Sequence, residues 1–219
     1  MKRKKLTELM SDLKAFSPRD DNDNYYEEFK IKAPSSDELR ALIELPYEVA
    51  ITGDLDDLIL TTGTKDSIIG GENYRYRRDN SRVSLHSHPY RPSQGFFQYV
   101  TTSIPDQYVS TLAHEDTKLS LVHSNGIMIY KKPTLSGMED LEGRAVLFKG
   151  YMEIGIDLIS SNIGLPCTEG FRKFQELSFE EKTGTLRSFE EKTNMIVDEA
   201  LWIDRNGIER VRNRIFTPN

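Results

Sequence analysis

The sequence predicts an α/β protein with one main domain, because a central series of β-like runs lies between two segments of helical periodicity. With 219 residues, 37% of them hydrophobic, the chain can bury one core and carry extensions, or form two small domains. The central runs are short, rich in β-branched and apolar residues, and end at turn-forming residues. They cover 49–52, 58–62, 82–88, 119–123, 127–131 and 145–156.

The segment before these runs contains two predicted helices. Apolar residues recur at helical spacing over 5–16. They are Leu6, Leu9, Met10, Leu13 and Phe16. After a polar loop at 17–24, Ser35 and Glu38 have the spacing of a capping box, so a second helix is expected to begin there and to end before Pro46.

The remaining elements are a hairpin and two helical regions. Ser124, Asn125 and Gly126 separate two strand-like runs and tolerate positive φ, so 119–131 is predicted to be a β-hairpin. A helix is expected over 103–115. The last sixty residues regain helical periodicity, and their apolar residues are expected on buried helix faces. These residues are Phe171, Phe174, Leu177, Leu186, Phe189, Ile196, Val197, Leu201 and Trp202.

Three segments follow from this pattern. They are an N-terminal helix and linker over 1–34, the main domain over 35–160, and a helical C-terminal extension over 161–219. The extension carries mixed charge clusters at 180–182 and 190–192. Such clusters suit packing on the domain and contact with a partner equally well.

Charge and cysteine usage limit the setting and the partners of the protein. A net charge of -6 disfavours a nucleic-acid partner, and the basic clusters at 75–78 and 210–214 are typical of solvated faces. The single cysteine, Cys167, excludes an intramolecular disulfide and lacks a catalytic partner in the sequence. Because the sequence shows neither a signal peptide nor a long apolar run, we expect a cytoplasmic protein without a membrane partner.

The most informative residues are two histidines in one of the predicted strands. Residues two apart in a strand point to the same face, so His86 and His88 should converge on one point. Ser103 and Asp106 follow in a Ser-x-x-Asp arrangement. Two imidazoles and one carboxylate, with a fourth position left to water, are typical of a catalytic zinc site rather than a structural one.

Each of these features also has an ordinary structural explanation. Two histidines on a strand can be satisfied by hydrogen bonds alone. Serine followed three residues later by an acid, with Pro105 in the first turn, is typical of a helix N-terminus. The two interpretations of Ser103 and Asp106 are compatible, because an aspartate in the first turn can both cap a helix and bind a metal.

Together, the segments His86-Ser87-His88-Pro89 and Ser103-Ile104-Pro105-Asp106 resemble the signature of the JAMM (JAB1/MPN+) zinc metalloprotease family. That family also carries a glutamate where a helix passes into the first strand. Pro46-Tyr47-Glu48, followed by Gly53, is similar to that setting. The resemblance covers about 38–157 and implies a curved, mixed sheet flanked by helices, with the metal at the end of the strand that carries His86.

The resemblance implies a hydrolase that cuts an amide or isopeptide bond in a protein or peptide substrate, including a bond to a ubiquitin-like protein. In this scheme His86, His88 and Asp106 hold Zn²⁺, which binds water at its open position and lowers the pKa of that water. Glu48 takes a proton from the water as general base and passes it to the leaving amine. Ser103 donates a hydrogen bond to the oxyanion formed on the attacked carbonyl.

The chain departs from the family pattern after the second histidine. The segment 89–102 is longer than the family usually has, and its aromatic residues are expected to form a lid or to shape the substrate groove. These aromatics include Phe96, Phe97 and Tyr99. Ser93 follows a proline, as the family's serine commonly does, but a phenylalanine stands three positions later and cannot bind a metal. For the glutamate, Glu44 is the alternative to Glu48.

Two other function classes fit parts of the pattern. A catalytically silent relative would keep the fold as a scaffold or protein-binding module, although such a protein has no need to retain metal ligands. A phosphoesterase with two metals would need additional histidine and aspartate ligands. Only His114 and His123 are left, and we expect both to be surface or packing residues rather than ligands. The glycines form no phosphate-binding loop.

Overall fold

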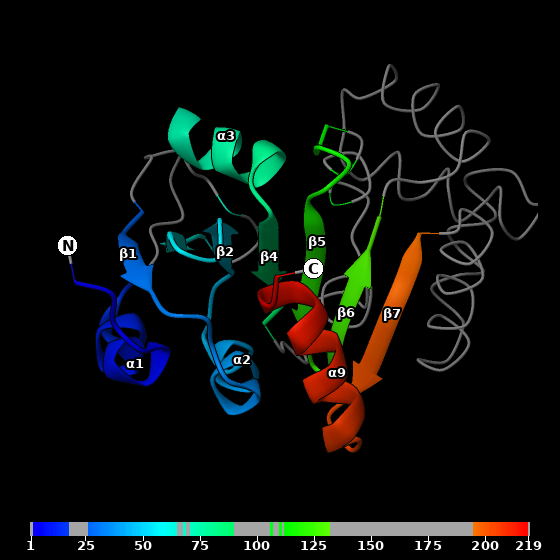
Figure 1. Ribbon diagram of the computed structural model, residues 1–219. Coiled ribbons are helices and arrows are strands. Elements are labelled where there is room, and N and C mark those ends of the chain that lie inside the picture. Colours follow the sequence, from blue (N-terminus) through cyan, green and yellow to red (C-terminus); the bar gives the residue numbers. More distant parts are fainter. Residues whose placement is uncertain are drawn as a thin grey trace, which may run out of the picture.

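The described part of the chain forms one mixed sheet with helices on both faces (Figure 1). The computed structural model describes residues 2–17, 26–64, 68, 71–89, 106, 110, 112–131 and 195–218. These residues contain seven strands and four helices. The predicted α/β class is therefore confirmed.

The strands are β1 (Glu28–Ile31), β2 (Val49–Gly53), β3 (Leu58–Thr62), β4 (Val83–Ser87), β5 (Lys118–His123), β6 (Gly126–Tyr130) and β7 (Ile196–Leu201). Their order across the sheet is β1-β3-β2-β4-β5-β6-β7. Within this sheet β4 and β5 run parallel, and every other neighbouring pair is antiparallel. The chain therefore crosses over between β4 and β5. His86 and His88 lie at the end of β4, and Asp106 lies within the crossover connection.

The two faces of the sheet differ in chemistry. Helices α1 (Leu6–Ala15), α2 (Ser36–Leu42) and α9 (Arg205–Phe216) bury apolar residues against one face, which forms the main core. Helix α3 (Glu72–Asn80) lies on the opposite face, where the side chain of Arg77 donates to Thr52 at 3.3 Å and pairs with Glu28. No helix in the described ranges is both long and apolar enough to cross a membrane.

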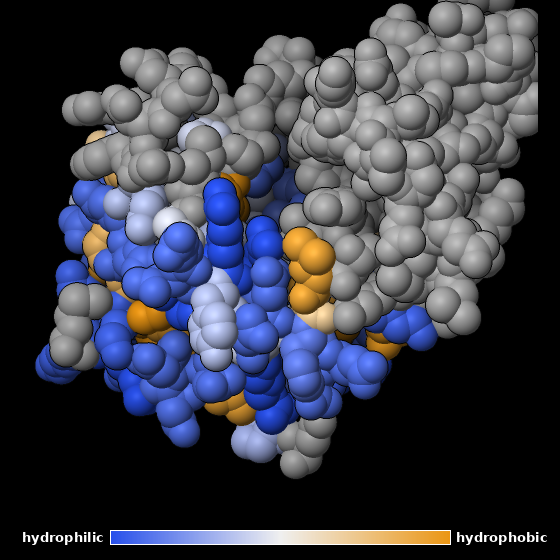
Figure 2. All heavy atoms as spheres, turned by 90° about the horizontal axis from the view of Figure 1, so that it is seen from above, coloured by the Kyte–Doolittle hydropathy of each residue, from blue (hydrophilic) through white to orange (hydrophobic). Residues whose placement is uncertain are grey.

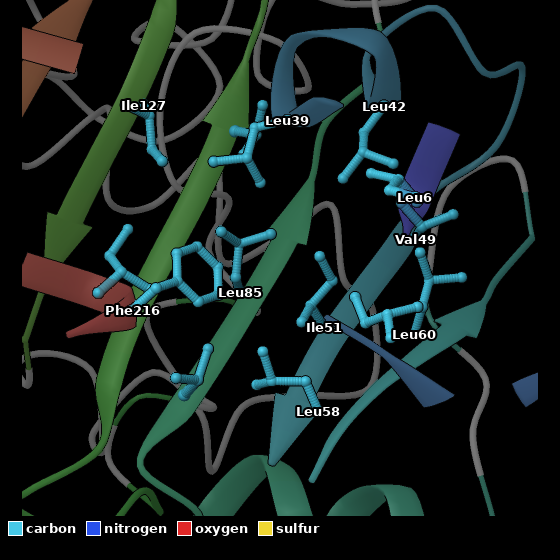
Figure 3. Packing of buried hydrophobic residues seen from close by; sticks show 14 of the residues in the cluster. Leu6, Leu39, Leu42, Val49, Ile51, Leu58, Leu60, Leu85, Ile127 and Phe216 are labelled. Atoms are coloured by element: carbon cyan, nitrogen blue, oxygen red, sulfur yellow. The ribbon is translucent and has the colours of Figure 1, made fainter. Parts of the chain in front are cut away.

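Leucine, isoleucine and valine side chains from the central strands interlock with those of the helices (Figure 3). Among the labelled residues, each of the following is at most 1% exposed: Leu6, Leu39, Leu42, Val49, Ile51, Leu58, Leu60, Leu85 and Ile127. Burial of such a side chain contributes roughly 1.5–3 kcal/mol. This core fixes which residues of β2 and β4 point away from it, and therefore which residues can form a site on the other face.

Helix α2 begins with the capping box expected from the sequence. The Ser35 hydroxyl accepts from the Glu38 N–H at 3.3 Å, and the Glu38 carboxylate accepts from the Ser35 N–H at 2.9 Å. The other carboxylate oxygen of Glu38 accepts from the Thr7 N–H in the first turn of α1, at 2.8 Å. Burial acts to raise the pKa of Glu38, but these hydrogen bonds outweigh it and lower the pKa. One carboxylate therefore caps two helices.

We expect Glu38→Gln to destabilise the protein by about 1–3 kcal/mol at neutral pH, because an amide cannot accept both N–H groups as a carboxylate does. Since folding lowers the pKa of Glu38, its ionisation stabilises the fold above the unfolded pKa, and this contribution is lost as pH falls through the folded pKa. Urea unfolding of both proteins at pH 7 and near pH 3 measures the difference. Asp37→Asn, at an exposed neighbouring position, is the control, and equal losses in both variants would contradict this role for Glu38.

The strands predicted in the middle of the chain are confirmed to within one residue at each end, except for 145–156, which lies outside the described residues. The predicted hairpin is also confirmed, because β5 and β6 are antiparallel and joined by the turn Ser124-Asn125. Gly126 is needed for a reason that the sequence did not indicate. A Cβ at this position would lie 1.9 Å from the Ala200 carbonyl oxygen of β7.

The prediction of helix for the whole C-terminal tail is wrong at 196–201, which forms strand β7. Its ladder with β6 is antiparallel, and this pairing overrides the helical spacing of its apolar residues. Val197 and Leu201 are accordingly 41% and 42% exposed rather than buried on a helix face. Helix α9 is confirmed, and its N-cap is Asp204, whose carboxylate accepts from the Gly207 N–H at 3.0 Å.

Two elements were not predicted from the sequence, and one predicted helix ends earlier than expected. Strand β1 lies in the segment predicted as helix and linker, so the sheet draws strands from all three predicted segments. Helix α3 was not predicted, because its charged sequence has no apolar stripe. Of the helix expected over 103–115, Asp106 and Ser110 are helical, but turns follow from Leu112, so the helix ends early.

Candidate metal centre

The two histidines of the motif lie on the face of the sheet opposite the main core. Ala50 of β2 pairs with His86 of β4, and the neighbouring Ile51–Leu85 pair points into the core. Since strand residues alternate between faces, His86 and His88 share the outer face, as predicted. The backbone N–H of His88 donates to the Val122 carbonyl of β5 at 2.8 Å, which holds the end of β4 in place.

Asp106, a helical residue, meets both imidazoles from the other side of the site. His86 Nε2 lies 3.0 Å from Asp106 Oδ1, and His88 Nε2 lies 3.3 Å from Asp106 Oδ2. The two Nε2 atoms are 3.2 Å apart. The three predicted metal ligands are thus brought together, although they come from two elements separated along the chain.

The spacing of these donor atoms suits a small metal ion. Ligand atoms about 2.0–2.1 Å from a zinc ion, at tetrahedral angles, lie about 3.3 Å from one another. The contacts of 3.0, 3.2 and 3.3 Å are close to that value, with Asp106 using a different oxygen toward each histidine, and one donor atom from each residue lies within 4.8 Å of the other two. Two nitrogens and one carboxylate oxygen form a donor set that zinc prefers, and among the described residues no fourth ligand joins this group.

The electrostatics of the group suit a cation. Burial would raise the pKa of Asp106, but His86 and His88 outweigh it and hold the pKa well below its usual range. Burial lowers the pKa of His88, which Asp106 opposes only in part, so this imidazole is neutral at pH 7. For His86, burial acts to lower the pKa but Asp106 and Glu48 raise it overall. An anionic carboxylate and a neutral imidazole are the forms that bind metals, so Asp106 and His88 are ready to bind, whereas a metal would have to displace a proton from His86.

One polar atom of the site has no hydrogen-bond partner. His88 Nδ1 is buried and unpaired within the part of the chain that the structure describes. A ligating histidine usually donates its other N–H to a carboxylate or carbonyl. His88 lacks that second hydrogen bond among the described residues. Its imidazole, 3% exposed, is held instead by packing, by the backbone hydrogen bond of the residue and by Asp106.

Glu48 lies at the start of β2 on the same face as the histidines. Its N–H donates to the Thr64 carbonyl at 2.9 Å and its carbonyl accepts from Gly63 at 2.8 Å, which fixes the backbone. The residue is 8% exposed, and its charge contributes to raising the pKa of His86. The rival, Glu44, points to solvent with a side chain 65% exposed, 3.9 Å from Lys14. Of the two glutamates, only Glu48 is placed to act at this centre.

Several predicted residues fall outside the described part of the chain. These include Ser103, the rejected alternative Ser93, the aromatics of the long segment (Phe96, Phe97 and Tyr99), and Cys167. The tail residues Phe171, Phe174, Leu177, Leu186 and Phe189, expected on buried helix faces, also lie outside the described residues. The remaining histidines are not among the clustered ligands. The side chain of His114 is 60% exposed, whereas His123 is buried and its Nε2 lies 3.1 Å from Glu199 of β7. Both agree with the expectation of surface and packing roles.

Helix α3 adds two residues to this face that were not predicted. Tyr74 is buried, and burial raises the pKa of its phenol, with Glu48 and Asp106 adding to the rise. Arg78 stands one turn further on, and its positive charge contributes to lowering the pKa of His86. A basic cluster in a helix without an apolar stripe resembles a solvated face, so the sequence offered no signal for this placement.

Comparison of the chain with protein-family models, with curated proteins and with solved structures found no match. The resemblance to the JAMM family therefore depends on the motif residues of this chain alone. The described part of the chain is an α/β fold with a seven-stranded mixed sheet, and His86, His88 and Asp106 form a group that could hold a metal ion.

Proposed function

We propose that the protein is a zinc-dependent hydrolase of amide or isopeptide bonds, of the JAMM type. The observation that carries the proposal is the meeting of His86, His88 and Asp106 at separations of 3.0–3.3 Å, with the buried Glu48 on the same face of the sheet. A structural zinc site would use four protein ligands, so the three ligands found among the described residues, beside a buried acid, favour a catalytic site.

The three proposed ligands supply two nitrogen atoms and one oxygen atom to the ion. His86 and His88 offer their Nε2 atoms from one rigid strand, and Asp106 offers a carboxylate oxygen from a helical residue. Magnesium and calcium prefer oxygen ligands throughout, so the two imidazoles favour zinc. When bound, zinc polarises the substrate carbonyl and lowers the pKa of water, so that attack on an amide proceeds near neutral pH.

The other residues move protons and stabilise charge. The Glu48 carboxylate accepts a proton from the attacking water and returns it to the leaving nitrogen, which expels the product as an amine. In the proposal the Ser103 hydroxyl donates a hydrogen bond to the developing oxyanion. The substrate class is a protein or peptide amide, and an isopeptide bond to a ubiquitin-like protein falls within it.

The test measures zinc-dependent cleavage of a peptide library, so that no substrate has to be chosen in advance. Zinc-loaded protein is incubated with a proteome-derived peptide library and with isopeptide-linked lysine peptides, and new amino groups are identified by mass spectrometry. We expect cleavage that a chelator abolishes and added zinc restores, and that zinc-loaded Glu48→Gln lacks. If the zinc-loaded wild type produces no more cleavage than Glu48→Gln, the hydrolase proposal fails and a scaffold role takes its place.

A further inference from the structure

Arg78 belongs to α3, which lies on the sheet face that carries the candidate metal centre, and Asp79 holds its guanidinium in place. Its Nε donates to Asp79 Oδ1 at 2.7 Å, and its Nη2 donates to Asp79 Oδ2 at 3.0 Å. The two side chains are 18% and 20% exposed, so the pair is largely shielded from water. Burial acts to lower the pKa of Arg78, but Asp79 outweighs it and raises the pKa, which keeps the guanidinium charged.

This pairing occupies only one edge of the guanidinium. Asp79 takes the Nε–Nη2 edge, whereas no acceptor for Nη1 exists among the residues that the structure describes. The neighbouring Arg77 differs, since it pairs with both Glu28 and Thr52 across the sheet. The free Nη1–Nη2 edge presents two parallel N–H donors, which is the geometry that binds a carboxylate through two hydrogen bonds.

The position of Arg78 relative to the metal ligands follows from the contacts that its helix makes with the sheet. Its neighbour Arg77 donates to Thr52 of β2, which pairs with Ser84, two residues before His86 on β4. Its other neighbour, Asp79, accepts the His114 N–H at 2.6 Å through its carbonyl. Tyr130 of β6 pairs with Leu119, and His86 pairs with Leu121, so Tyr130 stands one row from His86 on the same face. The rings of Tyr130 and His86 meet edge to face at 6.5 Å between centroids. The charge of Arg78 acts on Tyr130 and on His86, which is consistent with a guanidinium close to both.

The surface on this side of the molecule suits a polar ligand. Seen from above, from the α3 end of the view in Figure 1, the described surface is mostly hydrophilic with separate apolar spots (Figure 2). Of the exposed large apolar residues, only Tyr76 lies on α3. Charged and polar contacts are thus the natural means of recognition near α3.

We propose that the free edge of Arg78 binds a carboxylate of the substrate, so that the preferred substrates are acids. They are peptides or amino-acid conjugates that carry a free carboxylate in addition to the scissile amide. This inference rests on the proposed hydrolase function, since it names the substrate class of the same site. Asp79 is then a positioning residue, because it fixes the plane of the guanidinium.

The test compares matched acids and amides. N-acetyl dipeptides with a free C-terminal carboxylate, and the same dipeptides as C-terminal amides, are titrated into zinc-loaded Glu48→Gln protein by ligand-observed NMR. We expect the acids to bind about tenfold tighter or more, the effect of a charge-assisted hydrogen bond. Arg78→Gln should remove this preference, Arg78→Lys should reduce it, and Arg75→Gln, at an exposed position of the same helix, should leave it unchanged.

Two results would overturn the inference. Equal binding of acids and amides to the parent protein is one, and an acid preference that survives in Arg78→Gln is the other, because the carboxylate would then bind the zinc or another residue. If Arg78→Gln fails to fold, an unchanged preference in Arg78→Lys has the same meaning. Zinc content, measured on the same samples, reports separately on the proposed function.

Discussion

Replacing Glu48 with glutamine is expected to lower turnover by about 10²–10⁴-fold while the zinc content stays unchanged. Glutamine has nearly the same shape as glutamate but cannot take up the proton of the attacking water. Glu48 is buried at the start of β2, on the face that carries the histidines, and it is not among the clustered ligand atoms. Initial rates on a substrate found by the library experiment, with zinc measured on the same samples, check this prediction.

Glu44→Gln is the matched control for this experiment. Glu44 lies four residues earlier and is exposed, with Lys14 as its ion-pair partner. We expect its substitution to leave turnover unchanged, because a surface ion pair of this kind contributes about 0–1 kcal/mol to stability and nothing at the site. Loss of turnover in Glu44→Gln, with normal rates in Glu48→Gln, would make Glu44 the general base and contradict the assignment of Glu48.

Replacing Asp106 with asparagine is expected to weaken zinc binding by at least about 100-fold. Loss of a residue that only supports a ligand already costs 10–100-fold, and Asp106 supplies a ligand atom and a negative charge. Its two oxygens lie 3.0 and 3.3 Å from the Nε2 atoms of His86 and His88. Competition with a chromophoric chelator measures the affinity.

Asp116→Asn is the control for the Asp106 variant, since the side chain of Asp116 is 92% exposed and lies 3.6 Å from His114 Nδ1. We expect its zinc affinity to equal that of the wild type. Equal affinity in Asp106→Asn as well would mean that the carboxylate pairs with the imidazoles without binding the ion. The histidines would then need a different third ligand.

The parts of the fold that the sequence predicted depend on interactions between near neighbours. The capping box at Ser35 and Glu38 and the hairpin turn at Ser124-Asn125 each involve a few consecutive residues, and both were found. Strand β7 depends on pairing with β6, which is distant in sequence, so its apolar residues were assigned to a helix. Strand β1 is short and polar, and its place at the sheet edge comes from β3.

The same distinction applies to the site. The shared face of His86 and His88 follows from the period of a strand, which is a local property. That Asp106 meets them, and that Glu48 rather than Glu44 faces them, required the fold, and only the resemblance to a known motif pointed there. Arg78 belongs to no recognisable motif, and its helix is charged and lacks an apolar stripe. Its position on this face could therefore be found only from the structure.

The most direct test of the central claim is the metal content of the protein, purified without chelator and measured by elemental mass spectrometry. We expect about one zinc per chain in the wild type and in His114→Ala, whose side chain is 60% exposed, and almost none in the His86→Ala/His88→Ala double variant. Circular dichroism verifies that the double variant is folded. Absence of zinc from the wild type after zinc is added back, or equal zinc in the double variant, would contradict the account.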